Sequence, residues 1–137
     1  MSDTKKAPEY LLIFRGNDWS RGLSPEQMQQ VASQWMAWFQ GLTREGKVLA
    51  GNPLEPEGKI VSGRSGNLVT DGPFAESKEA VGGYFLLRVD NLDEAVAIAK
   101  QCPGLAYGIK VEVRPVADMC PMIKEVQAQT QNEPALA

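Results

Sequence analysis

The feature that most constrains the fold is an apolar stripe with helical spacing within residues 24–46. Ser24 is followed by Pro25 and then by Gln27, the pattern of a capping box with proline at the first helical position. Gly46 is a suitable residue to end such a helix. The spacing predicts a helix with one apolar face. That face comprises Met28, Val31, Ala32, Trp35, Phe39 and Leu42.

A second helical pattern occupies residues 91–102. Asn91 and Glu94 form a capping pair at its start, and Pro103-Gly104 is expected to end it. Its predicted apolar stripe comprises Leu92, Ala95, Val96, Ala99 and Cys102.

Strand-like segments lie before, between and after the two helices. Residues 9–16 form a short apolar run, residues 47–56 predict a short strand followed by a loop, and a hairpin is expected at Ile60–Ser62 and Leu68–Thr70. Two later strands alternate cleanly, which assigns their side chains to opposite faces. One face carries Phe85, Leu87, Val89, Ile109, Val111 and Val113, and the other carries Tyr84, Leu86, Arg88, Lys110, Glu112 and Arg114.

The order of these elements predicts the fold class. Strand, helix, strands, strand, helix and strand follow one another as in a ferredoxin-like α+β domain, an antiparallel sheet with two helices on one face. The length of 137 residues fits one such domain. We expect an arm at residues 1–8, the domain at 9–118 and a tail at 119–137 that begins with a short helix.

The chain contains no histidine, which narrows the possible chemistry. Ser-His-Asp and Cys-His nucleophiles are excluded, as are histidine-ligated haem and the usual zinc and iron sites. Catalysis would have to use carboxylates, Lys, Tyr, Cys or an outside cofactor. The net charge of −3 disfavours direct nucleic-acid binding, and we expect no membrane span. Cys102 and Cys120 lack CxxC spacing, so reduced thiols in a cytoplasm are expected.

Three side chains have a structural interpretation that competes with a functional one. Trp35 lies on the first helical stripe and is expected in the core. Trp38 lies toward the edge of that stripe, which fits either the core or a rim or interface. Cys102 lies on the second stripe and is expected to be an inert buried thiol.

The stretch "LVTDGPFAESKEAVGGYFLLRV" at residues 68–89 has two interpretations. In the structural one, Asp71, Gly72 and Pro73 make a turn, and Phe74 anchors the loop in the core. Residues 75–80 would then form a helical turn in which Glu76, Lys78 and Glu79 are solvated.

In the functional interpretation, the same loop forms one wall of a pocket. Gly82 and Gly83 leave space for a ligand or for a second backbone. Paired carboxylates in a cleft can have one raised pKa, so Asp71 and Glu76 are the candidate catalytic residues. The candidate ligand-binding residues lie on the helix-free sheet face and are Tyr84, Arg88, Glu112 and Arg114. Carboxylates could hold Mg²⁺, but no metal-loop spacing is present, so we predict neither a metal nor a cofactor.

The segments "DGPFAESKEAVGGYFLL" and "YGIKVEVRPV" carry a family resemblance that extends over residues 9–116. In these segments the chain resembles the YCII-related family, in its DGPF-domain branch. The resemblance implies a homodimer in which two ferredoxin-like sheets face each other as a dimeric α+β barrel. It also implies a link to sigma factors, since some genes of this branch lie beside or are fused to those of extracytoplasmic-function sigma factors. Other members carry a His-Asp pair suspected of catalysis, of which only Asp71 is matched here.

Two functions follow as alternatives. The first is a small-molecule-binding or regulatory module, with a sigma factor as a possible partner in transcription. The second is a cofactor-independent enzyme of isomerase or lyase type that uses Asp71, Glu76 and an arginine. We favour the first, because histidine is missing and no nucleophile arrangement is visible.

Overall fold

The computed structural model describes residues 7–16, 19–72 and 80–132. Within these residues, six strands and three α-helices follow one another, with one 3₁₀ helix between α2 and the last strand. In chain order they are β1 (Glu9–Arg15), α1 (Pro25–Arg44), β2 (Val48–Pro53), β3 (Lys59–Ser62), β4 (Leu68–Asp71), β5 (Val81–Arg88), α2 (Leu92–Ala99), η1 (Pro103–Tyr107), β6 (Lys110–Pro115) and α3 (Pro121–Asn132).

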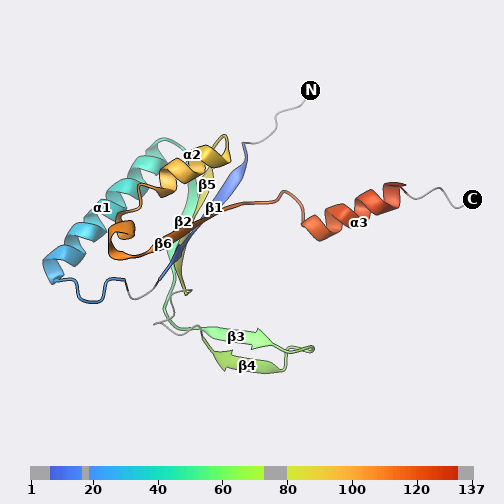
Figure 1. Ribbon diagram of the computed structural model, residues 1–137, viewed down its shortest axis with the longest axis horizontal. Coiled ribbons are helices and arrows are strands. Elements are labelled where there is room, and N and C mark those ends of the chain that lie inside the picture. The colour runs from blue at the N-terminus through green and yellow to red at the C-terminus, as the bar shows by residue number, and fades with distance from the viewer. Residues whose placement is uncertain (1–6, 17–18, 73–79, 133–137) are drawn as a thin grey trace, which may run out of the picture.

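Four strands form an antiparallel sheet in the order β2-β5-β1-β6, and β3 pairs with β4 in a separate hairpin. Helices α1 and α2 lie together on one side of the four-stranded sheet (Figure 1). This is the ferredoxin-like α+β arrangement, so the predicted fold class is confirmed. The other side of the sheet, which we call the open face, is covered by neither α1 nor α2.

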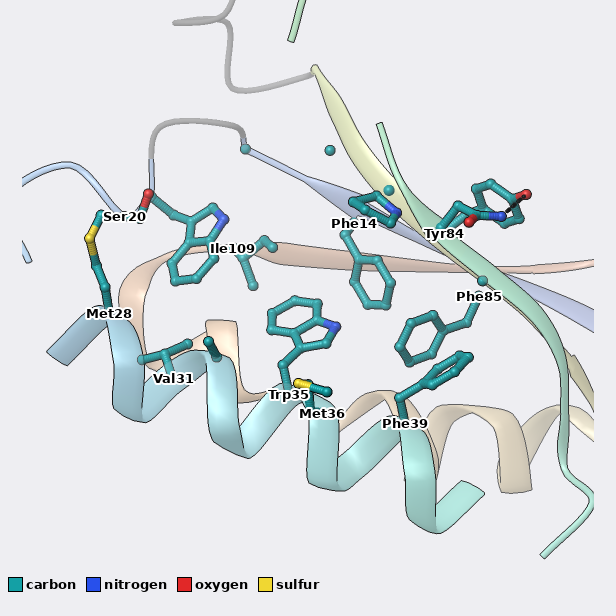
Figure 2. Close-up of a pocket in the computed structure, with 18 of the residues that line it drawn as sticks. Phe14, Ser20, Met28, Val31, Trp35, Met36, Phe39, Tyr84, Phe85 and Ile109 are labelled. Carbon is teal, nitrogen blue, oxygen red and sulfur yellow. Dashed lines mark hydrogen bonds between the residues drawn. The ribbon is translucent and has the colours of Figure 1, made fainter. Parts of the chain in front are cut away.

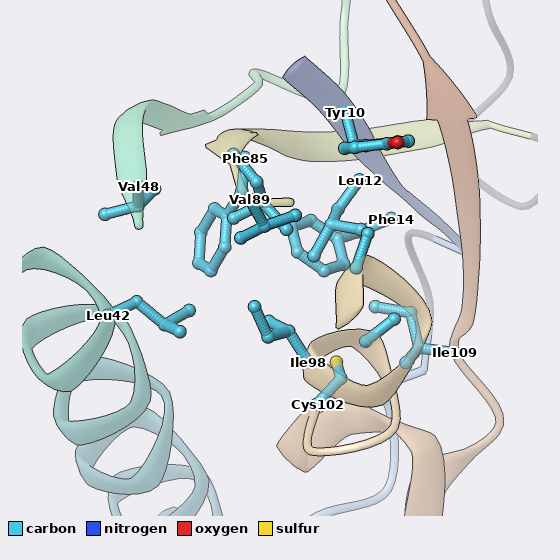
Figure 3. Packing of buried hydrophobic residues seen from close by; sticks show 13 residues of the cluster. Tyr10, Leu12, Phe14, Leu42, Val48, Phe85, Val89, Ile98, Cys102 and Ile109 are labelled. Carbon is cyan, nitrogen blue, oxygen red and sulfur yellow. The ribbon is translucent and has the colours of Figure 1, made fainter. Parts of the chain in front are cut away.

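The core lies between the sheet and the two helices. The predicted alternation of β5 is confirmed, because Phe85, Leu87 and Val89 are buried while the residues between them are not. Leu12 of β1 and Leu87 are fully inaccessible to solvent. Figure 3 shows side chains of the sheet pointing toward Ile98 of α2, within the cluster of buried apolar residues.

Helix α1 begins as predicted and turns its apolar face toward the sheet. The Ser24 hydroxyl accepts from the Gln27 backbone N–H, and the Gln27 side chain accepts from the Ser24 N–H, which completes the capping box. Of the predicted apolar stripe, however, only Val31 and Leu42 are buried in α1. Met28 is 47% exposed. The rest of the apolar face is less buried, because a cavity lies between part of α1 and the sheet.

Helix α2 is capped by Asn91, as predicted, but it ends at Ala99, earlier than expected. The Gln101 N–H bonds to the Ile98 carbonyl, three residues back, so the chain tightens there before η1 begins. Buried residues of α2 are Ala95, Ile98 and Ala99, whereas Leu92 is exposed. Leu92 was predicted on the apolar stripe, but as the first residue of the helix it is 45% exposed.

Two elements project from the body of the domain (Figure 1). The hairpin β3–β4 confirms the predicted strands, and its Ile60, Val61, Leu68 and Val69 are all exposed. Helix α3 forms the predicted start of the tail, and Met122 on it is 70% exposed. Across the described residues, the helices lack the length and continuous apolar character that a membrane span requires.

Candidate functional site

An open cavity of about 790 Å³ lies between α1 and the sheet. Its walls are the inner side of α1, the end of β1 with the segment that leads into α1, and the edge formed by β2 and β5. We call it the α1 cavity. Figure 2 shows Val31, Trp35 and Phe39 of α1 facing Phe14 and Phe85 of the sheet across this space.

Aromatic rings form much of the cavity lining. Trp35 meets Phe14 edge to face, with the ring centroids 5.1 Å apart, and stacks with Trp19 at 6.0 Å and an interplanar angle of 23°. Phe39 and Phe85 lie 5.0 Å apart at the other end. Trp35 is thus a partly buried core residue, as predicted, and it also lines the cavity. From the sequence, Trp35 and Phe39 were placed only on the apolar face of the helix, and their role in lining a cavity was missed.

Two glycines allow β2 and β5 to come close together at the cavity wall. A Cβ atom on Gly51 would lie 2.7 Å from the Phe85 ring, and one on Gly83 would lie 2.9 Å from the Asn52 carbonyl oxygen. Both distances are too short for real side chains, so glycine is required at these positions. Of the two predicted reasons for Gly83, the close approach of a second backbone is the one observed.

No acidic or basic side chain lines the α1 cavity among the described residues. Its polar lining residues are Ser20, Gln40, Asn52 and Tyr84. The Asn52 amide donates to the Tyr84 hydroxyl at 3.2 Å. Figure 2 shows Tyr84 pointing away from α1 while Phe85 points toward it, so the Tyr84 hydroxyl belongs to the open face. The interior of the cavity is therefore almost entirely apolar.

The four predicted ligand-binding residues, Tyr84, Arg88, Glu112 and Arg114, lie together on the open face. Their charged members are engaged in ion pairs. Glu112 accepts from Arg15 at 2.6 and 2.8 Å and from Arg114 at 3.0 Å. Arg88 donates to Glu9 at 3.1 Å. The hydrogen bonds from Arg15 and then from Arg114 lower the pKa of Glu112 below its ordinary value.

This lowered pKa predicts a pH dependence of stability. The folded state holds the Glu112 proton less tightly than the unfolded chain does. The ionised Glu112 side chain therefore stabilises the folded state above the ordinary pKa of 4.5, and this stabilisation is lost as the pH falls through the pKa that Glu112 has in the folded state. We expect Glu112→Gln to lose less stability than the parent between about pH 5 and pH 3. Urea denaturation across this range measures the difference. Glu125→Gln on the exposed helix α3 is the control, and an identical acid slope in parent and Glu112→Gln would contradict the assignment.

The structure describes only one of the two candidate catalytic residues. Asp71 lies at the end of β4 with its side chain 85% exposed, and it pairs with Lys59 of β3. Glu76 lies outside the described residues, as do Pro73, Phe74, Lys78 and Glu79. The predicted group of Asp71 and Glu76 with an arginine stays a prediction, because Glu76 is not among the described residues. The partners observed for Asp71, Arg88 and Arg114 are Lys59, Glu9 and Glu112, respectively.

Neither cysteine forms a disulfide. Cys102 is buried, and burial raises the pKa of its thiol, which makes it a poor nucleophile as predicted. Cys120 is exposed. Within residues 7–16, 19–72 and 80–132, no cluster of three or more cysteine or carboxylate side chains is placed to hold a metal ion.

Comparison with known proteins relates the chain to a solved structure and to a family. One solved structure that resembles the chain is 5-chloro-2-hydroxyhydroquinone dehydrochlorinase from Burkholderia phenoliruptrix AC1100, in complex with 2,5-dihydroxybenzoquinone. The two are 14% identical, the match covers 80% of this chain and 93% of that chain, and the TM-score is 0.46. No curated protein matches the chain. The model of the YCII-related domain matches residues 9–120, so the chain belongs to the YCII-related family.

Proposed function

We propose that this protein is a small-molecule-binding module that takes a largely apolar ligand into the α1 cavity. The single observation that supports this most is the cavity itself, about 790 Å³ in volume and lined by aromatic and methionine side chains. Ligand sites are typically concave, mostly apolar and about 300–1,000 Å³ in volume.

A purely structural role does not account for a cavity of this size. Protein interiors are close-packed and contain few voids larger than a water molecule. Here Met28 and Met36 line the space and are 47% and 61% exposed, although both extend from a well-capped helix beside the core. Methionine is common on binding surfaces that adapt to different ligands, because its side chain is flexible and polarisable. The methionine and tryptophan residues along this one helix were the sequence signal that could have indicated the site.

Filling the cavity tests the proposal. Ala32 and Ala37 are both exposed residues of α1, but only Ala32 lines the α1 cavity. We expect Ala32→Trp to weaken binding of the neutral fluorescent probe N-phenyl-1-naphthylamine by at least about tenfold, because the indole occupies the ligand's space. Ala37→Trp introduces the same side chain outside the cavity and should leave binding unchanged. Equal affinity in both variants, measured by fluorescence titration, would place the probe elsewhere.

We also propose that two copies associate through their open faces. Leu11, Ile13 and Leu86 form an apolar centre there, and the ion pairs Glu9–Arg88 and Arg15–Glu112 lie around it. Four strands and the seven residues of β1 give a face of about 19 by 24 Å. The area of this face is more than half of the surface that each partner buries in a standard interface, which is about 800 Å². A face that carries both charge signs can pair with itself about a two-fold axis.

The binding-module proposal is preferred to the enzyme alternative for a specific reason. The arginines that a carboxylate mechanism would use, Arg88 and Arg114, pair with Glu9 and Glu112 rather than with Asp71. A regulatory role with a sigma factor rests on the family resemblance alone. A cytoplasmic location rests on the two free cysteines.

A further inference from the structure

We infer that the ligand of the α1 cavity is an uncharged, flat aromatic compound. This inference rests on the proposed binding function and specifies the chemistry that the cavity selects. Three properties of the lining support it: the absence of charge among the described lining residues, the arrangement of the rings, and the small number of hydrogen-bonding side chains.

The charge of the ligand follows from the lining. A buried ion needs an opposite charge or several hydrogen bonds, since taking it out of water is otherwise very unfavourable. The lining within the described residues offers no charged side chain. Arg15, which adjoins Phe14 in the chain, donates to Glu112 on the open face. A carboxylate or phosphate inside the cavity would therefore have no cationic partner among the described lining residues.

The shape of the ligand follows from the aromatic geometry. Trp19 and Trp35 are nearly parallel, and Phe14 meets Trp35 at 70°. The cavity thus offers both ring faces and ring edges, which are the two surfaces that aromatic rings prefer to pack against. On the sheet side, the rings of Phe39 and Phe85 lie over Gly51. A cavity with walls that are largely aromatic accommodates a flat aromatic molecule better than a bulky saturated one.

The polarity of the ligand is limited by the few hydrogen-bonding side chains available. Of the polar lining residues, Asn52 and Tyr84 are bonded to each other, which leaves Ser20 and Gln40. Buried polar groups are costly unless they find partners. A ligand with one or two neutral polar groups fits this lining, and a highly hydroxylated one does not.

Three matched compounds test the inference on the full chain: 2-naphthalenemethanol, which is neutral and aromatic; 2-naphthoate, its anionic counterpart; and decahydro-2-naphthalenemethanol, which is neutral and saturated. Calorimetry measures their affinities, with tryptophan fluorescence as a second readout. We expect the aromatic alcohol to bind at least about tenfold more tightly than the anion. We expect it to bind about three- to tenfold more tightly than the saturated alcohol.

Two variants connect the selectivity to named residues. Trp19→Leu should reduce the preference for the aromatic alcohol over the saturated one by about threefold, because one ring of the stacked pair is lost. Met36→Lys places an ammonium group at the exposed rim of the cavity and should shift the preference toward 2-naphthoate by about tenfold. Ala37→Lys introduces the same charge outside the lining and should leave the ratio unchanged.

The outcomes separate this inference from the proposed function. Equal affinity for naphthoate and the aromatic alcohol overturns the assignment of an uncharged ligand. Equal affinity for the saturated and aromatic alcohols overturns the aromatic assignment, while binding in the cavity stands. Failure of N-phenyl-1-naphthylamine and all three compounds to bind overturns the proposed function itself.

Discussion

Leu86→Asp is expected to leave the protein monomeric at micromolar concentration. Leu86 lies at the centre of the open face, opposite Leu11 in β1 and Ala50 in β2. In a two-fold dimer the substitution introduces two carboxylates into an apolar interface without partners, and an unpaired buried charge costs several kcal/mol. A loss of about 4 kcal/mol corresponds to about a thousandfold weaker association. Sedimentation velocity over a concentration series measures the change.

The control for this experiment lies on the other side of the domain. Leu105 in η1 is an exposed apolar residue, and η1 follows α2 on the helix-covered side of the sheet (Figure 1). Leu105→Asp should leave the association unchanged. A parent protein that sediments as a monomer at the same concentrations would refute the dimer proposal, and no variant would be needed.

Leu87→Ala is expected to lower the free energy of unfolding by about 2–5 kcal/mol, a large loss for a single substitution. Leu87 is fully inaccessible to solvent and lies in the cluster that joins the sheet to the helices. Truncation removes buried apolar contacts and leaves a void that the surrounding strands cannot close. Urea denaturation measures the difference between the parent and the variant.

Two further substitutions make the test of Leu87 specific. Leu105→Ala removes an exposed leucine and should change the free energy of unfolding by no more than about 0.5 kcal/mol. Leu86→Ala, one residue away but on the opposite face, should have an effect that depends on protein concentration, because it acts on the proposed dimer. A loss for Leu87→Ala below about 1 kcal/mol would show that this core is loosely packed.

Local structure was predictable from the amino-acid sequence. The capping box at Ser24 and the cap at Asn91 depend on residues within one helical turn, so their patterns were sufficient to predict both helix starts. The alternation in β5 indicated which side chains face the helices, since neighbouring residues of a strand point to opposite sides. The element order then restricted the topology to a ferredoxin-like sheet.

The candidate site, by contrast, depends on tertiary contacts. The aromatic stripe of α1 has the same pattern whether it is buried against the sheet or lines a cavity, because periodicity gives the direction of side chains and not the distance to the opposite element. The ion-pair partners of the charged residues could not be predicted from the sequence either. Arg15 and Glu112 are 97 positions apart in the chain and meet only because β1 and β6 are adjacent in the sheet. Cavity volume and ion pairing both arise from contacts between distant segments, and a local pattern does not encode such contacts.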